Sequence, residues 1–239
     1  MPTEPGSHAP HRVVTRAEWL AERSALLVKE KAFSRQREEL AQQRRALPWV
    51  RVDKPYRFDT AAGARSLAEL FGARAQLIVY HFMFKPEAAA GCAHCSFWAD
   101  HYSGMVAHLQ QRDVSFVAVS RAPLPKLLAF RERMGWSFDW VSCGDGDFNH
   151  DFHASFTPEE LASGQVYYNY ARSPAGPADR EGISVFWRDA AGDVFHTYSC
   201  YARGIDMMNG TYQFLDLVPK GRDEPPGQAQ HWVRYHDRY

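Results

Sequence analysis

Large apolar side chains are sparse in the first part of the chain. From Thr15 to Ala46 there is no Pro or Gly, and Arg, Glu, Gln and Ala dominate, which predicts one long helix. A capping-box pattern, Thr15-x-x-Glu18, marks its start, and Pro48 ends it. Its largest apolar residues recur every seven positions, at Trp19, Leu26, Phe33, Leu40 and Leu47. So narrow an apolar stripe can make only a narrow packing contact, and its partner is either the helix's own domain or a second copy of the chain.

Two densely apolar runs follow, at residues 75–84 and 114–120. Runs that are apolar on both faces are typical of central strands in a sheet covered on both sides. Helix-like spacing follows each run, over 95–109 and over 123–135. The order strand, helix, strand, helix predicts a parallel sheet with right-handed crossovers.

The remaining chain carries weaker patterns. Residues 138–142 suit a short strand, 144–156 a polar loop, and Thr157 opens a helix with another capping box. The runs 183–188 and 194–198 predict an antiparallel hairpin. Apolar residues at helical spacing then predict a closing helix, at Ile205, Met208, Tyr212 and Leu215.

These patterns divide the chain into four parts. Residues 1–14 are rich in Pro, Gly and His and are expected to be a disordered lead. Residues 15–48 form an N-terminal helical extension, and 49–219 hold the strands and helices of the main domain. Residues 220–239 are expected to be a polar C-terminal tail.

Composition narrows the classes of partner. Lys and Arg (28) balance Asp and Glu (28), so no global field favours nucleic acid or an anionic membrane. No run approaches the ~20 apolar residues of a spanning helix, and residues 1–14 show no secretory signal. We therefore expect a soluble, cytoplasmic protein. In that compartment four cysteines are more typical of redox or metal chemistry than of structural disulfides.

The candidate chemistry lies between the first apolar run and its helix, in Cys92-Ala93-His94-Cys95. A free thiol has a pKa of about 8.5, so only ~3% is thiolate at pH 7, and the amides of a helix N-terminus can lower that pKa. Cys92 falls where the helix should begin, whereas Cys95 shares a face with Trp98. The spacing predicts that Cys92 attacks, that the more buried Cys95 resolves the mixed disulfide, and that a cationic His94 stabilises the thiolate.

Two other uses of this motif stay open. Cys-x-x-Cys is also half a zinc site, for which His150-x-x-His153 is the nearby second pair, or the cysteines are structural. The strand–motif–helix context favours redox chemistry. The electrons would then reside on the two sulfurs, so neither an organic cofactor nor a metal is expected. Cys143 and Cys200 are isolated in the sequence.

Further side chains are candidates for binding substrate. Arg121 follows the second apolar run, and loops at the carboxyl ends of parallel strands face the ligand crevice. It could pair with the thiolate or an anionic substrate, or cap the next helix. Trp98 is a second candidate contact, and His153 is either a proton carrier near the dithiol or a structural histidine. Ser96 and Asp100 are expected on the helix surface.

Seven stretches of the chain resemble a known family. They are Cys92 to Asp100, Ala118 to Leu124, Met134 to Trp136, Asp147 to His153, Phe195 to Tyr198, Tyr201 to Gly204 and Asn209 to Tyr212. Together they resemble a bacterial family of thioredoxin-like proteins described as predicted dithiol–disulfide oxidoreductases, originally a domain of unknown function. The resemblance implies an α/β, thioredoxin-like fold, a central mixed sheet flanked by helices, with a long N-terminal helix. It also implies exchange with a thiol or disulfide substrate or electron donor.

Three positions depart from better-known relatives of that fold. Thioredoxins have Trp before the first cysteine and a cis-Pro before the strand that faces the dithiol, where this chain has Gly91 and, roughly, Gly182. Peroxiredoxins keep Thr three residues before their cysteine, where Ala89 stands. The missing Pro argues against thioredoxin-style protein substrates, and the missing Thr favours thiol–disulfide exchange over a peroxiredoxin-like peroxidase. A non-enzymatic metal or partner-binding module stays open as a third alternative.

Overall fold

The computed structural model describes residues 11–239, so most of the expected disordered lead lies outside the described residues. The chain divides into two compact units, Met1–Pro48 and Trp49–Tyr239. None of the helices in residues 11–239 combines the length and apolarity that a membrane crossing requires.

Within residues 11–48, the described part of the first unit, one helix forms, α1 (Arg16–Arg45), which confirms the predicted long helix. Its N-terminus is a complete capping box: the Glu18 N–H donates to Thr15 Oγ1 (3.3 Å), and the Glu18 carboxylate accepts from the Thr15 N–H (2.8 Å). Residues seven positions apart differ in direction by only about 20° per repeat around a straight helix. The stripe that begins at Trp19 therefore runs along one face of α1.

The second unit is built on an eight-stranded mixed sheet with the order β1-β10-β9-β4-β5-β6-β2-β3. Strands β4, β5 and β6 pair in parallel, whereas β9 runs antiparallel to β4, and β10 antiparallel to β9. The strands are β1 (Val50–Arg51), β2 (Arg57–Thr60), β3 (Gly63–Ser66), β4 (Gln76–His81), β5 (Val114–Ser120), β6 (Asp139–Ser142), β9 (Gly182–Arg188) and β10 (Val194–Tyr201). The order β10-β9-β4-β5, with helices between β4 and β5 and after β10, is the thioredoxin fold, as expected.

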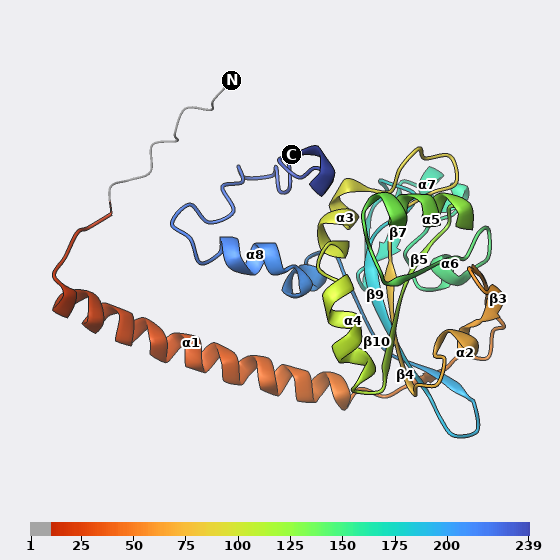
Figure 1. Cartoon of the computed structure of the whole chain (residues 1–239), viewed down its shortest axis with the longest axis horizontal. Coiled ribbons are helices and arrows are strands. Elements are labelled where there is room, and N and C mark those ends of the chain that lie inside the picture. The colour runs from red at the N-terminus through yellow and green to blue at the C-terminus, as the bar shows by residue number, and fades with distance from the viewer. Residues whose placement is uncertain (1–10) are drawn as a thin grey trace. The chain divides into compact units, whose positions relative to one another are not determined.

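Helices flank the sheet, and α3 and α4 lie end to end beside it (Figure 1). The helices are α2 (Leu67–Leu70), α3 (Ala93–Ala99), α4 (Ser103–Gln110), α5 (Leu124–Arg133), α6 (Phe148–Asp151), α7 (Pro158–Ala162), α8 (Gly210–Leu215) and the 3₁₀ turns η1 (Ala202–Met208) and η2 (His236–Arg238). A separate ribbon pairs β7 (Gln165–Tyr168) with β8 (Ala171–Pro174).

Three of the predicted elements differ from the structure. The single helix over 95–109 is two helices, because a turn at 100–102 is held by long-range contacts: Asp100 accepts from the Trp136 indole (2.8 Å), and Ser103 Oγ accepts from the Ser137 N–H (3.0 Å). The polar loop over 144–156 contains α6. The closing helix begins as the 3₁₀ turn η1.

The alternation of side chains along β4 divides the core into two layers. Leu77 and Val79 face a layer with α2 and α6, whereas Tyr80 packs with α3 and α5 in a second layer that is rich in aromatic rings. Burying one such side chain stabilises the folded state by about 1.5–3 kcal/mol. The two layers together therefore hold the sheet in place. The cysteine helix α3 belongs to the aromatic layer, through Cys95 and Trp98.

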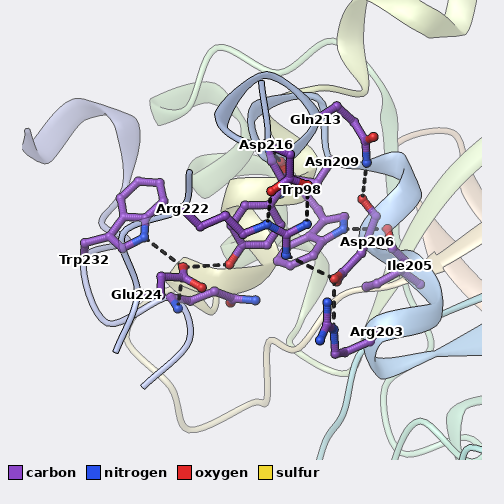
Figure 2. A network of polar contacts seen from close by, with 12 residues as sticks. Trp98, Arg203, Ile205, Asp206, Asn209, Gln213, Asp216, Arg222, Glu224 and Trp232 are labelled. Carbon is purple, nitrogen blue, oxygen red and sulfur yellow. Dashed lines mark hydrogen bonds and ion pairs between the residues drawn. The ribbon is translucent and has the colours of Figure 1, made fainter. Parts of the chain in front are cut away.

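The segment 220–239, expected to be a polar tail, packs against the domain, and its Val233 is only 3% exposed. Figure 2 shows the polar network at its start. The Glu224 carboxylate accepts three hydrogen bonds, from Tyr212 Oη (2.9 Å), the Gln230 N–H (2.8 Å) and Trp232 Nε1 (2.9 Å). Three charge-assisted bonds to one carboxylate fix this segment against α8.

Arg222 provides the second half of this network (Figure 2). Its guanidinium lies 3.8 Å from the centre of the Tyr212 ring and donates two bonds to the Asp216 carboxylate (2.8 and 2.9 Å). It also donates to Asp206 (3.4 Å) in η1. Planar stacking and bidentate pairing are contacts that only arginine makes together, so this side chain joins the C-terminal segment to η1 and α8.

Gly182 gives a test of the sheet's packing. A Cβ at this position would overlap the Tyr201 ring, at 2.7 Å from Cε1, and that ring is fixed because Tyr201 Oη donates to the Phe152 carbonyl (2.8 Å). We expect Gly182→Ala to lower the free energy of unfolding by about 1–3 kcal/mol, measured by urea denaturation.

The matched control is Gly104→Ala in α4, where a Cβ meets nothing within 4 Å. Gly104 is the second residue of α4, so Ala there adds helix propensity without crowding and should leave the free energy of unfolding unchanged or raise it by less than about 1 kcal/mol. Equal urea midpoints for Gly182→Ala and the unmodified protein would contradict the crowding at Gly182.

Candidate active site

The turn from β4 into α3 places Cys92 at the N-cap of the helix, with extended backbone angles (φ −60°, ψ 130°). The Cys92 N–H donates to the Met83 carbonyl (3.0 Å), which folds the loop back on itself. The Cys92 carbonyl accepts from both the N–H and the Oγ of Ser96 (2.9 Å each). Ser96 was expected on the helix surface, and this is wrong: its side chain points back to the cap, and the residue is 0% exposed.

Glycine precedes Cys92 because there is no room for a side chain. A Cβ on Gly91 would lie 2.8 Å from Phe82 Cε1 and 3.1 Å from Phe130 Cε1. An aromatic ring nevertheless reaches this position from the C-terminal segment, because Tyr235 Oη donates to the Gly91 carbonyl (2.7 Å). The only sequence signal of this contact is an aromatic residue in a polar stretch, 144 positions away.

The two thiols of the motif differ in their surroundings. Cys92 is half-buried, whereas Cys95 is 1% exposed, and both are free. A hydrogen bond from the Cys95 side chain, aided by the backbone N–H groups of Cys95 and His94, lowers the pKa of Cys92 to about 7 against the opposing effect of burial. Burial raises the pKa of Cys95 well above its usual range. At pH 7 about half of Cys92 is therefore thiolate, against ~3% for a free thiol, while Cys95 stays protonated.

The charged groups near the dithiol act in different directions. The Glu181 carboxylate, next to β9, raises the pKa of both cysteines, although it is a smaller cause than hydrogen bonding or burial. The His94 side chain is exposed, and it is the backbone N–H of His94 that contributes to the lowered pKa of Cys92. Stabilisation of the thiolate by the His94 imidazole stays a prediction.

A small cavity of about 220 Å³ opens beside Cys92. Its apolar lining comes from the loop before α3 and from the loop before β9: Met83, Ala88, Ala90, Pro177 and Ala178. Asp179 also lines it, and Arg121 Nη1 lies 3.3 Å from the Asp179 carboxylate. The structure thus brings Arg121 to the edge of the site, paired with an acid that sequence reasoning did not single out.

The other candidate binding residues lie elsewhere. Trp98 is 4% exposed in the aromatic layer, and its indole donates to the Ile205 carbonyl (2.9 Å; Figure 2). His153 has its ring 4.8 Å from that of Tyr167, and burial lowers its pKa. Neither residue lines the cavity beside Cys92. Asp100, expected on the surface, is half-buried and accepts from Trp136 and His236.

The other two cysteines, Cys143 and Cys200, are buried away from the Cys92 site. Burial raises the pKa of Cys143 to about 12, and its thiol donates to the Ser120 carbonyl (3.5 Å). Cys200 is 6% exposed. Across residues 11–239, no three His, Cys, Asp or Glu side chains converge in a way that could hold a metal ion.

Comparisons with known proteins place nearly the whole chain in one family. Residues 8–239 match the family model described as "Bacterial protein of unknown function (DUF899)". No curated protein matches the chain.

Several solved structures are similar at low identity. Peroxidoxin BcpB from Mycobacterium tuberculosis is 15% identical with a TM-score of 0.46, and the match covers 69% of this chain and 94% of that one. A mutant of Xanthomonas campestris peroxiredoxin Q is 12% identical with a TM-score of 0.45, over 67% and 89%. A secreted disulfide oxidoreductase of Mycobacterium tuberculosis, homologous to E. coli DsbE, is 16% identical with a TM-score of 0.36, over 65% and 92%.

The hydrogen bond from Cys95 gives a direct prediction about Cys92. Because the Cys95 thiol donates to the charged form of Cys92, Cys95→Ala should raise the pKa of Cys92 above its value of about 7 and slow its alkylation near neutral pH. The measurement is the rate of iodoacetamide labelling of Cys92 between pH 5 and 10, followed by peptide mass spectrometry.

Two variants control this experiment. Cys95→Ser keeps a donor and should shift the pKa of Cys92 less than Cys95→Ala does. Cys143→Ala should leave the labelling profile unchanged. An unshifted profile for Cys95→Ala would show that the helix amides alone set the pKa.

Proposed function

The chain belongs to the DUF899 family of bacterial proteins, and we propose that it is a thiol–disulfide oxidoreductase that works through Cys92 and Cys95. One observation carries the proposal: a half-buried thiol at a helix N-cap has its pKa lowered to about 7, and a fully buried thiol with a raised pKa follows three residues later in the first turn of the same helix. Such a pair combines a nucleophile that is ionised at neutral pH with a second thiol that is protected from outside reagents.

The reaction needs only the two thiols and a disulfide. The Cys92 thiolate attacks one sulfur of a disulfide R–S–S–R′, so the S–S bond breaks, R–S⁻ leaves and takes a proton from solvent, and Cys92 carries –S–R′. Cys95 then loses its proton and attacks the Cys92 sulfur, which releases R′–S⁻. Two electrons pass from the dithiol to the substrate, and the reverse sequence oxidises a thiol substrate.

The surroundings of the pair have supporting roles in this proposal. The amides of α3 and the Cys95 thiol stabilise Cys92 as attacking and as leaving group. His94, exposed at the first turn, adds positive charge when it is protonated. A cytoplasmic location, where the glutathione and thioredoxin systems keep thiols reduced, would leave the pair ready to reduce a disulfide.

The test is the product of oxidation. Reduced protein treated with one equivalent of bis(2-hydroxyethyl) disulfide should release two equivalents of mercaptoethanol and form a Cys92–Cys95 disulfide, identified by mass spectrometry of a non-reduced digest. Cys95→Ser should stop at a mixed disulfide on Cys92, and Cys92→Ser should not react. Cys143→Ser and Cys200→Ser should behave as the unmodified protein. A disulfide that involves Cys143 or Cys200, or no reaction, would refute the proposal.

We also propose that the seven-residue stripe on α1 pairs two copies of the chain. An apolar seam at this spacing is the pattern by which helices pair in coiled coils. Sedimentation equilibrium at micromolar concentration should give a dimer mass, and Leu26→Lys with Phe33→Lys should give a monomer that keeps the dithiol chemistry. A monomeric mass for the unmodified protein would exclude a stable dimer.

A further inference from the structure

We propose that the cavity beside Cys92 binds the apolar substituent of a small, uncharged disulfide, and that this class of molecule is the substrate. The inference rests on the proposed oxidoreductase function and deepens it. It is carried by the construction of the cavity walls, by their chemistry and by the cavity's size.

The first wall is the loop that precedes α3, and it is held from behind. Lys126, in α5, extends its ammonium group into the loop and donates to the carbonyls of Pro86 (2.7 Å) and Ala88 (3.1 Å). The Met83 carbonyl accepts from the Cys92 N–H (3.0 Å), which sets this wall directly against the cysteine. Ala88 and Ala90 are therefore presented to the cavity by a fixed loop.

The second wall precedes β9 and is tied down through its backbone. The Phe156 N–H donates to the Ala178 carbonyl (2.9 Å), and the Arg180 N–H donates to the Ala154 carbonyl (2.8 Å). Between them, the buried Asp179 accepts from Ser155 Oγ (2.8 Å) and pairs with Arg121. With both walls fixed, the cavity is preformed and does not depend on a substrate to shape it.

The lining selects an apolar and uncharged group. Five of the lining side chains are Met, Ala or Pro, and the two charged ones already have partners: Lys85 with Glu87 (3.0 Å) and Asp179 with Arg121 (3.3 Å). Glu181, whose carboxylate acts on both thiols, adds negative charge to the surroundings. An anionic disulfide would meet repulsion there, whereas an alkyl group would displace water from apolar surface.

The size of the cavity limits the substituent. Its volume of about 220 Å³ is below the roughly 300–1,000 Å³ of sites for drug-sized ligands. This volume matches a chain of a few carbons beside the Cys92 sulfur, whereas the whole of oxidised glutathione or of a folded polypeptide exceeds it. In the reaction, R–S–S–R and the two thiols give the Cys92–Cys95 disulfide and two R–SH, with no further reactant.

The test compares three disulfides in a single turnover, so that no reductant is needed. Reduced protein is mixed with excess dipropyl disulfide, oxidised glutathione or insulin, and the loss of the Cys92 and Cys95 thiols is followed by quenching with an alkylating agent. Free dithiothreitol under the same conditions gives the intrinsic reactivity of each disulfide. Relative to dithiothreitol, we expect the protein to favour dipropyl disulfide over oxidised glutathione at least tenfold, and insulin to react slowest.

A variant that fills the cavity connects this preference to its walls. Ala178→Leu should slow the reaction with dipropyl disulfide at least fivefold while iodoacetamide labelling of Cys92 and the melting temperature stay unchanged. Ala89→Leu is the matched control, because Ala89 is exposed in the same loop as Ala88 and does not line the cavity. It should keep the full rate.

The outcomes separate the two proposals. If the protein ranks the disulfides as dithiothreitol does, or if Ala178→Leu keeps the full rate, the substrate class is wrong and the oxidoreductase function stands. If insulin reacts fastest, the substrate is a polypeptide and the inference is overturned. If none of the three oxidises Cys92 and Cys95, the proposed function itself fails.

Discussion

The interaction of the buried Cys95 thiol with the Cys92 sulfur, which shifts the two pKa values in opposite directions, is the one on which the proposed chemistry depends. It exists because α3 begins at Cys92, so that two residues three positions apart lie on the same face of the first turn. Burial keeps Cys95 protonated, and Cys95, together with the helix amides, keeps about half of Cys92 ionised at pH 7. One turn of helix thereby gives two identical side chains different protonation states.

The rest of the domain fixes that turn. Strand β4 and its aromatic neighbours bury Cys95, and the Met83 backbone contacts both cysteines: its carbonyl accepts from the Cys92 N–H, and its N–H donates to Cys95 Sγ (3.4 Å). The C-terminal segment secures the outer side, through Tyr235 at Gly91 and through Asp237, which pairs with Arg133 in α5 (2.8 Å). Segments more than a hundred residues apart in sequence therefore meet at the start of α3.

Local patterns were enough to predict much of this. The continuous apolar runs identified β4 and β5, and capping boxes located the starts of α1 and α7. The position of Cys-x-x-Cys between a strand and a helix indicated which thiol is the less buried. These features depend on residues within a few positions of one another. Such patterns do not reveal contacts between distant residues, and His81 is an example. Its buried ring is hydrogen-bonded to Asn149 and Ser184, and desolvation keeps it neutral by lowering its pKa to about 4.

Most features that sequence reasoning missed depend on distant contacts. Ser96 is the exception, because its side chain bonds to the Cys92 carbonyl only four residues earlier, whereas the break after α3 is set by the bond from Trp136 to Asp100. Trp98 suits a binding platform in sequence and is a core residue in the fold. The second wall of the cavity comes from a loop that its Pro and Gly content marks as irregular, and only its pairing with residues 154–156 gives it a fixed position.

Whether Cys92 and Cys95 form a redox pair is decided by the reduction potential of the protein, measured by equilibration with dithiothreitol or glutathione redox buffers. We expect one two-electron transition, in which a tenfold change of the equilibrium constant corresponds to about 30 mV. That transition should be carried entirely by Cys92 and Cys95 and be unchanged in a protein with both Cys143→Ser and Cys200→Ser. Absence of a two-electron transition, or its loss in that double variant, would show that Cys92 and Cys95 are not the redox pair.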